Sequence, residues 1–287
     1  MPFSFRPLLL LALCAFLTAC GAIKLTYNNA DSLIYFWLDG YVDVTVDQKI
    51  RVKDELLALQ QWHRKTQLPT FVTLSQTLQK QVMSDITPAL TCSNVDQAFL
   101  LLPPLLTYAE PSVLWLVTHL TPEQKQSMSK KFDKTNKEWR KDWQPATQEL
   151  LIKHSIRSLR DRIEPLYGKL TAEQLLLLRS NVAESPFDAR IAYTERLRRQ
   201  QDLLSVLKDI HSKKLTVEAA KEPMRKLLER NTDSPDLAYR AYAERIKQYN
   251  CAAFAKLHNS MSQSQRSNAM EKLQDYERDF KTLQTQK

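Results

Sequence analysis

The sequence predicts an all-α protein, a multi-helix and mostly antiparallel bundle of about eight to ten helices. Three observations support this fold class. The 287 residues include only three glycines, whereas hairpins, dinucleotide-binding turns and phosphate loops all draw heavily on glycine. Leucine, glutamine, lysine, arginine, glutamate and alanine are abundant, and these residues favour helices. Apolar residues also recur at helical intervals of three and four, as in the run Ile152, Ile156, Leu159 and Ile163.

Four helix starts share the pattern Ser/Thr-x-x-Gln after an apolar residue. In this pattern the hydroxyl accepts a hydrogen bond from the amide three residues on, and the Gln side chain reaches back to the first amide. We interpret all four as capping boxes with no further role. Prolines mark most connections between helices, Pro111, Pro165 and Pro223 among them. The four segments are Thr45–Gln48, Thr121–Gln124, Thr171–Gln174 and Ser262–Gln265.

The N-terminus has the pattern of a bacterial lipoprotein signal. Arg6 precedes an apolar run that ends in Leu17-Thr18-Ala19-Cys20, the lipobox. The run is roughly a dozen residues long, against the ~20 that a spanning helix needs. We expect residues 1–19 to be removed as a signal peptide and Cys20 to carry acyl chains such as palmitate. The alternative is an uncleaved anchor, or a signal peptide that ends at a cysteine by coincidence.

This signal sets the expected organisation of the chain. Residues 20–29 would be the lipidated cysteine and a short tether, and residues 30–287 a single helical periplasmic domain. Gly21, rather than Asp, follows the cysteine. This choice favours the outer membrane, facing the periplasm, over the inner membrane.

Charge and cysteine content fit such a compartment. The chain has 41 Lys and Arg against 32 Asp and Glu, so acidic partners are expected: an envelope protein or an anionic glycolipid, besides the membrane itself, and no nucleic acid. Cys14 leaves with the signal and Cys20 is lipidated. The remaining pair, Cys92 and Cys251, is expected to form one disulfide in an oxidising space, the alternative being two free buried thiols.

Three segments are candidates for contact with a partner or the membrane. Trp62, His63 and Arg64 lie at a helix break and could form a ligand corner, or simply a core residue and a helix end. Lys153, Arg157 and Arg160 form a basic row, which is either a membrane-facing surface or a solvated face with local ion pairs. In the aromatic segment 30–42, the residues expected at the level of lipid headgroups, unless the segment fills the core, are Tyr35, Trp37 and Tyr41.

No catalytic or metal-binding pattern is visible. The five histidines form no paired metalloprotease motif, C-x-x-C is absent, and so are G-x-S-x-G and the phosphate-loop motif. The sequence therefore predicts no enzyme activity, no cofactor and no metal site.

Two resemblances add to this interpretation. The lipobox, Tyr27-Asn28-Asn29-Ala30-Asp31-Ser32-Leu33, and Trp62-His63-Arg64 with Leu68-Pro69 resemble a family of uncharacterised bacterial lipoproteins, a domain of unknown function. Leu120-Thr-Pro-Glu-Gln124 and Leu170-Thr-Ala-Glu-Gln174 resemble the L-T-x-x-Q repeats of small periplasmic stress chaperones. That resemblance implies a basic, all-helical, cradle-like binder, although this chain is about twice as long.

Three functions remain as hypotheses. The first is a lipid-anchored protein with a non-enzymatic binding or structural role at the periplasmic face of the outer membrane. The second is a chaperone-like binder of unfolded or envelope-stress clients, which requires a concave surface with apolar patches rimmed by Lys and Arg. The third is a cell-wall or lipid hydrolase, which requires a cleft where carboxylates or a Ser/His pair converge.

Overall fold

The computed structural model describes residues 22–286, and within them every regular element is a helix. The predicted all-α fold is confirmed. The predicted signal peptide, residues 1–19, and the predicted lipidation site Cys20 lie outside the described residues. The helices are α2 (Ala22–Asn28), α3 (Ala30–Val42), α4 (Val46–Thr66), α5 (Leu68–Val82), α6 (Pro88–Phe99), α7 (Leu102–Thr118), α8 (Pro122–Trp143), α9 (Gln148–Tyr167), α10 (Ala172–Ala183), α11 (Ala189–Ser212), α12 (Val217–Thr232), α13 (Leu237–Asn259) and α14 (Gln263–Thr285).

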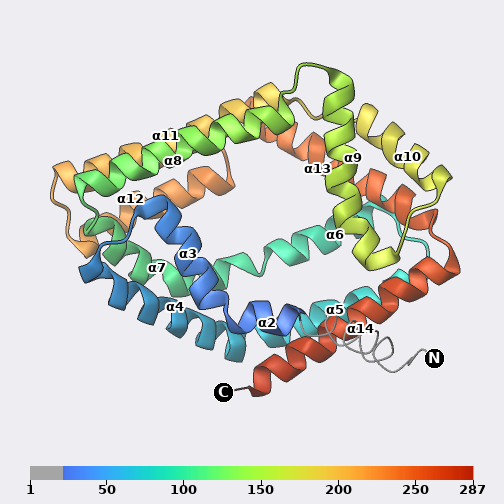
Figure 1. Ribbon diagram of the computed structural model, residues 1–287, viewed down its shortest axis with the longest axis horizontal. Coiled ribbons are helices and arrows are strands. Elements are labelled where there is room, and N and C mark those ends of the chain that lie inside the picture. Colours follow the sequence, from blue (N-terminus) through green and yellow to red (C-terminus); the bar gives the residue numbers. More distant parts are fainter. Residues whose placement is uncertain (1–21, 287) are drawn as a thin grey trace, which may run out of the picture.

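The helices are arranged around a ring with an open middle (Figure 1). The described part of the chain thus has thirteen helices in a ring, where the sequence predicted eight to ten in a bundle. One reason is that short connections such as Asn29 between α2 and α3 carry no strong breaker residue. Conversely, Pro111, Pro165 and Pro223 lie inside helices and end none of them.

The buried apolar residues form three separate clusters along this ring. The largest joins α5, α9, α10, α13 and α14 around Tyr167, Leu178 and Ala269. The second joins α7, α11 and α12 around Leu114 and Ile210. The third holds α3 against α8 and α11 through Val42, Met128 and Leu207. The core is therefore spread along the wall of the ring.

The two halves of the ring repeat one pattern of helix packing. In the first half, α3 to α8, helix α3 packs on α4 and α8, and α4 packs on α7. In the second half, α9 to α14, helix α9 packs on α10 and α14, and α10 packs on α13. Between the halves, α5 packs on α14 as α11 packs on α8, and α6 packs on α13 as α12 packs on α7 (Figure 1). Each helix of the first half thus corresponds to the helix six places later.

All four predicted capping boxes are present, and they join in pairs. Gln48 Nε2 donates to Gln124 Oε1 at 3.2 Å, and Gln124 Nε2 donates to Gln48 Oε1 at 2.7 Å. Each side chain also bonds the carbonyl two residues before its partner's cap: Gln48 that of His119, Gln124 that of Asp43. The interpretation of these boxes as helix starts alone is therefore incomplete, because they also lock one helical turn to another.

The second half repeats this arrangement. Gln174 Nε2 donates to Gln265 Oε1 at 2.8 Å, and Gln265 Nε2 donates to Gln174 Oε1 at 2.9 Å. The carbonyls are again those two residues before the partner caps, Ser260 and Lys169. All four glutamines are buried. Satisfied buried amides of this kind fix which turns meet, because any other pairing would leave polar groups without partners.

The turns before the first box of each half also correspond. Helix α3 ends at the buried Val42 and is followed by Asp43 with φ of 57°; α9 ends at the buried Tyr167, followed by Gly168 with φ of 84°. Three residues before these ends, Asp39 accepts a hydrogen bond from the Val44 amide and Glu164 from the Leu170 amide. Counting back from Val42 and Tyr167 therefore aligns α3 with α9.

Cys92 on α6 and Cys251 on α13 form a disulfide, with their Cα atoms 5.4 Å apart. The prediction of one disulfide is confirmed. Cys251 faces α6, which packs along α13. The bond spans 159 residues of sequence and closes the ring covalently between its two halves.

Candidate functional site

The most unusual surface lies along α6 and α7. Between Pro88 and Thr118 the chain has only two charged residues, Asp96 and Glu110. Each forms an ion pair with a lysine of another helix, Asp96 with Lys247 on α13 and Glu110 with Lys221 on α12. The segment is long and apolar enough to cross a membrane by length and composition alone, yet little of it is buried. We call its exposed apolar residues the α6–α7 strip: Val95, Phe99, Leu100, Leu102, Leu106 and Val113.

The strip belongs to the wall of the ring, because other side chains of both helices anchor them to their neighbours. Cys92 is joined to α13, Leu114 is 5% exposed in the second core cluster, and Ser112 donates to Glu55 at 2.8 Å. In contrast, Phe99 and Leu100 at the junction of the helices are 63% and 69% exposed. Apolar surface held rigidly in water is typical of a binding surface.

Helix α3 presents a second apolar surface. Leu33, Ile34, Phe36 and Trp37 are all exposed, Phe36 at 80% and Trp37 at 62%. We call these four residues the α3 face. A shallow apolar groove runs from it onto α2, lined by Ile23, Thr26, Tyr27, Ala30, Leu33 and Ile34.

The three aromatic residues expected at a membrane are therefore divided by the structure. Trp37 lies on the α3 face. Tyr35 is half-buried beneath Lys53, whose Nζ is 5.0 Å from the ring centroid. Tyr41 packs between Phe132 and Trp37 and belongs to the third core cluster.

The corner at Trp62, His63 and Arg64 joins distant parts of the chain. Trp62 stacks on Tyr108 of α7 with ring centroids 4.4 Å apart. His63 Nδ1 lies 2.9 Å from the Tyr27 hydroxyl. Arg64 donates to the Asn28 side chain at 2.9 Å and to the Gln286 carbonyl.

Burial dominates the electrostatics of this corner. It raises the pKa of Tyr27 to about 12, against the opposing effect of the Arg64 charge, and it lowers the pKa of His63 below its ordinary value. Both groups are therefore neutral at pH 7. The Tyr27–His63 contact holds α2 against α4, and the Arg64–Gln286 hydrogen bond holds the C-terminal end there. This arrangement is that of a structural joint.

The basic row on α9 lies elsewhere on the ring (Figure 1). Lys153, Arg157 and Arg160 are all exposed. Arg160 forms an ion pair with Glu164 at 3.1 Å, and Glu149, also on α9, forms an ion pair with Arg179 of α10. The row is exposed and Arg160 in it has a local ion pair, and the structure does not bring the row together with the Trp62 corner.

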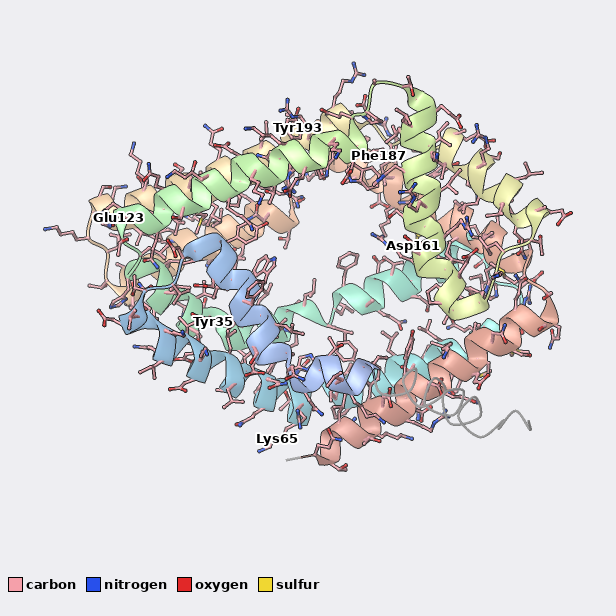
Figure 2. All side chains as sticks on the ribbon, in the orientation of Figure 1. Tyr35, Lys65, Glu123, Asp161, Phe187 and Tyr193 are labelled. Carbon is pink, nitrogen blue, oxygen red and sulfur yellow. A yellow bond between two sulfur atoms is a disulfide. The ribbon has the colours of Figure 1, made fainter. Side chains whose placement is uncertain are left out.

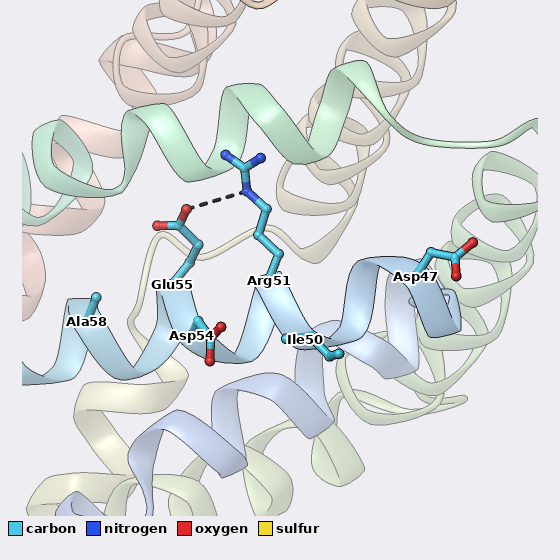
Figure 3. Close-up of a pocket in the computed structure, with 6 residues that line it drawn as sticks. All are labelled: Asp47, Ile50, Arg51, Asp54, Glu55 and Ala58. Carbon is cyan, nitrogen blue, oxygen red and sulfur yellow. Dashed lines mark ion pairs between the residues drawn. The ribbon is translucent and has the colours of Figure 1, made fainter.

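A shallow acidic groove follows the outer side of α4 (Figure 3). Its lining side chains all come from this one helix, with Asp47 and Asp54 beside Ile50. Arg51 pairs with Glu55 at 3.6 Å and lies over the Trp115 ring at 4.2 Å. The groove offers carboxylates for a cationic group. No group of three His, Cys, Asp or Glu residues placed to hold a metal ion occurs in residues 22–286.

Sequence reasoning missed the α6–α7 strip. The signal was present, since thirteen consecutive residues, 97–109, contain no charge and include Pro103 and Pro104. In the sequence, the prolines indicate connections between helices. This interpretation divides the segment into short apolar pieces, and each piece resembles a helix of an ordinary hydrophobic core. Only the packing shows that the apolar residues of both helices share one open side.

Comparison with known proteins adds a family and no activity. Residues 40–233 match the model of a family of unknown function, DUF6279. No curated protein and no solved structure matches the chain. The matched region runs from the end of α3 through α12 and covers more than half of the sequence. The chain therefore belongs to the DUF6279 family, whose function is unknown.

Proposed function

We propose that this protein is a lipid-anchored, non-enzymatic binding protein at the periplasmic face of the outer membrane, tethered through Cys20. On this proposal the α6–α7 strip takes an apolar segment of another envelope protein. The sequence supports the anchor through the lipobox, and the exposed strip supports the binding role.

The strip carries this proposal because the fold does not need it. None of its six residues belongs to the three core clusters, and the two charged residues of the segment form ion pairs with Lys221 and Lys247. Helix α12, which corresponds to α6 in the second half, has seven charged residues in sixteen. The same architecture thus forms with a charged helix at this position, so the requirements of folding do not explain the apolar surface of α6.

A photo-crosslinking amino acid at position 100 tests this role in the full chain in intact cells. We expect the Leu100 position to form adducts with one discrete envelope protein. A matched control uses position 176, because Leu176 on α10 is 68% exposed, nearly as much as Leu100. Equal adducts at both positions, or none at position 100, would contradict the proposal.

A second measurement tests the anchor separately. Cys20→Ser should prevent acylation, so the protein should lose the membrane fractionation and the mass of the acylated form. If the variant fractionates with the membrane as the wild type does, the tether is assigned wrongly.

The chaperone-like alternative is favoured by a specific observation. Of nine large apolar residues more than 60% exposed in residues 22–286, six lie in the first half, one lies on α2 just before it, and two lie in the second half. Several apolar patches around a ring suit a client without fixed structure better than one partner of fixed shape.

The alternative predicts binding to any extended apolar polypeptide. Reduced, carboxymethylated α-lactalbumin is a suitable probe because it cannot refold. Binding that is lost in Phe99→Ser with Leu100→Ser, and retained in Leu176→Ser, would support the chaperone role over a single dedicated partner. The cell-wall or lipid hydrolase stays an untested prediction without an observation in its favour.

A further inference from the structure

We infer that the α3 face, continued by the α2 groove, rests on the lipid bilayer and seats the ring on the membrane surface. This inference deepens the proposed anchoring through Cys20 and rests on it. The face is a second membrane contact, made by side chains.

The first observation is that α3 is firmly held while its apolar face is free. On its packed side, Val42 is 4% exposed, and Leu38 and Tyr41 contact the third core cluster. On the free side, Leu33 and Ile34 are 52% and 43% exposed, and Phe36 and Trp37 more so. The free side is therefore a permanent surface of the molecule, and no fluctuation is needed to uncover it.

The second observation is that the fold accepts charges in place of this apolar face. Helix α9 occupies the corresponding position in the second half, and counting back from Val42 and Tyr167 places Asp161 and Arg162 where α3 has Phe36 and Trp37. Asp161 and Arg162 are exposed, and α9 lies across the open middle from α3 (Figures 1 and 2). The aromatic pair is thus not a requirement of the architecture.

The third observation is the distance to the expected lipid. Helix α2 begins at Ala22, two residues after Cys20, so at most about 7 Å separates the two Cα atoms. Helices α2 and α3 add about 10 and 20 Å at 1.5 Å per residue. Leu25, 68% exposed, lies one turn into α2. Acyl chains at Cys20 would therefore place the bilayer directly beside this surface.

The composition of the surface and its rim suits the bilayer interface better than a protein partner. Tryptophan prefers the level of the headgroups, with aliphatic and Phe side chains reaching deeper. Two lysines stand at the edge of the face, Lys53 over Tyr35 and Lys131 with its Nζ 5.3 Å from the Tyr41 centroid. Both can meet lipid phosphates while their stems pack on the aromatic rings.

The test uses the full chain, purified from bacterial cells in detergent and reconstituted into vesicles of phosphatidylethanolamine and phosphatidylglycerol with brominated acyl chains. Bromine inside the bilayer quenches nearby tryptophan fluorescence. The chain has five tryptophans, so the share of Trp37 is the difference between the wild type and Trp37→Phe. The control is Trp139→Phe, because Trp139 stacks on Tyr193 at 5.4 Å between α8 and α11.

We expect Trp37→Phe to lose most of the quenching and Trp139→Phe to retain it. Equal quenching in all three proteins would overturn the inference. So would a Trp37 that stays open to aqueous iodide in vesicles, or one that is shielded only at high protein concentration, which would indicate contact between copies of the chain.

A second pair of variants removes the dependence on tryptophan. Phe36→Cys and Leu176→Cys are each treated with a membrane-impermeant maleimide. In detergent-free vesicles we expect loss of labelling at position 36 and full labelling at position 176. Labelling at both positions would contradict the inference even if the tryptophan variants fold poorly.

Failure of the anchor and failure of the α3 contact are distinguishable. Intact-mass analysis of the same preparation reports whether Cys20 carries acyl chains. If Cys20 is bare, the anchor proposal fails, and quenching of protein added directly to the vesicles still decides whether the α3 face enters the bilayer.

Discussion

The two halves of the ring have the same helix packing and different surfaces. Helices α3 to α8 and α9 to α14 share paired capping boxes, equivalent turns and equivalent partners. The first half nevertheless exposes the α3 face and the α6–α7 strip, where the second half has Asp161, Arg162 and a charged α12. Residues common to both halves therefore serve the fold, and residues that differ are the candidates for function.

The interiors differ too. The buried end of α9 is Tyr167, whose hydroxyl lies 2.8 Å from His258 Nδ1 on α13. Counting back from the last residues of the helices, the corresponding residues of the first half are Val42 and Val117, both in or against the third core cluster. A polar pair in one half thus replaces an apolar pair in the other, at the same place in the architecture.

The largest expected effect on the free energy of unfolding concerns the disulfide, the one covalent link that the described part of the second half does not repeat. The disulfide joins α6 to α13, while the corresponding pair α12 and α7 has no covalent link and is held by packing and the Lys221–Glu110 ion pair. Cys92→Ala with Cys251→Ala should lower the free energy of unfolding by about 4–5 kcal/mol in the entropic model for such a long loop. Urea unfolding measures this loss. Wild-type protein under reducing conditions should match the variant, and a much smaller change would show that packing already restricts the unfolded chain.

The paired glutamines should matter equally in both halves. Gln174→Leu and Gln124→Leu each remove the hydrogen bonds to the partner Gln and leave a cap amide and a carbonyl without a partner, so each should lower the free energy of unfolding by about 2–4 kcal/mol. The exposed Gln126 provides the control, since Gln126→Leu should change it by no more than about 0.5 kcal/mol. A clear difference between the two buried variants would break the equivalence of the halves.

Acid should weaken the second half through His258. This side chain is 2% exposed, and burial lowers its pKa below the ordinary 6.5. Its Nε2 donates to the Ser84 carbonyl at 2.9 Å, which leaves Nδ1 to accept from Tyr167. The unfolded chain therefore binds a proton that the folded chain excludes, so this contribution is complete above about pH 6.5 and is lost progressively as the pH falls below it.

His258→Gln should flatten the dependence of the unfolding free energy on pH between about 6.5 and 5. His63, whose pKa burial also lowers, adds a slope of the same sign, and His63→Gln measures it separately. An unchanged slope in His258→Gln would place the acid sensitivity elsewhere.

The smallest effect sharpens the comparison of surfaces. Phe36→Asp with Trp37→Arg gives α3 the residues that α9 has, so the free energy of unfolding should change by no more than about 0.5 kcal/mol. Thermal unfolding followed by circular dichroism measures this change. A large loss of stability would show that the aromatic pair supports the fold.

Local patterns were sufficient to predict the all-α fold class, the four capping boxes and the disulfide. Each depends on neighbouring residues or on a simple count, as with Thr121 and Gln124 or Cys92 and Cys251. The ring could not be predicted in this way, because one capping box does not reveal which other turn its Gln will meet.

The candidate surfaces were predicted only in part, for the same reason. An aromatic segment places Tyr35, Trp37 and Tyr41 on one helix, but only the packing of α3 on α4 and α8 decides which of them is free. The Trp62 corner was recognised as unusual, yet its partners Tyr108 and Tyr27 come from remote segments.

The repeated architecture within one continuous chain has a further consequence. An assembly of two identical subunits must present every patch twice, because one gene encodes both copies. An exposed apolar surface would then appear on both subunits and favour self-association. Joining the copies in one polypeptide removes that constraint, so one copy can stay soluble and charged while the other specialises.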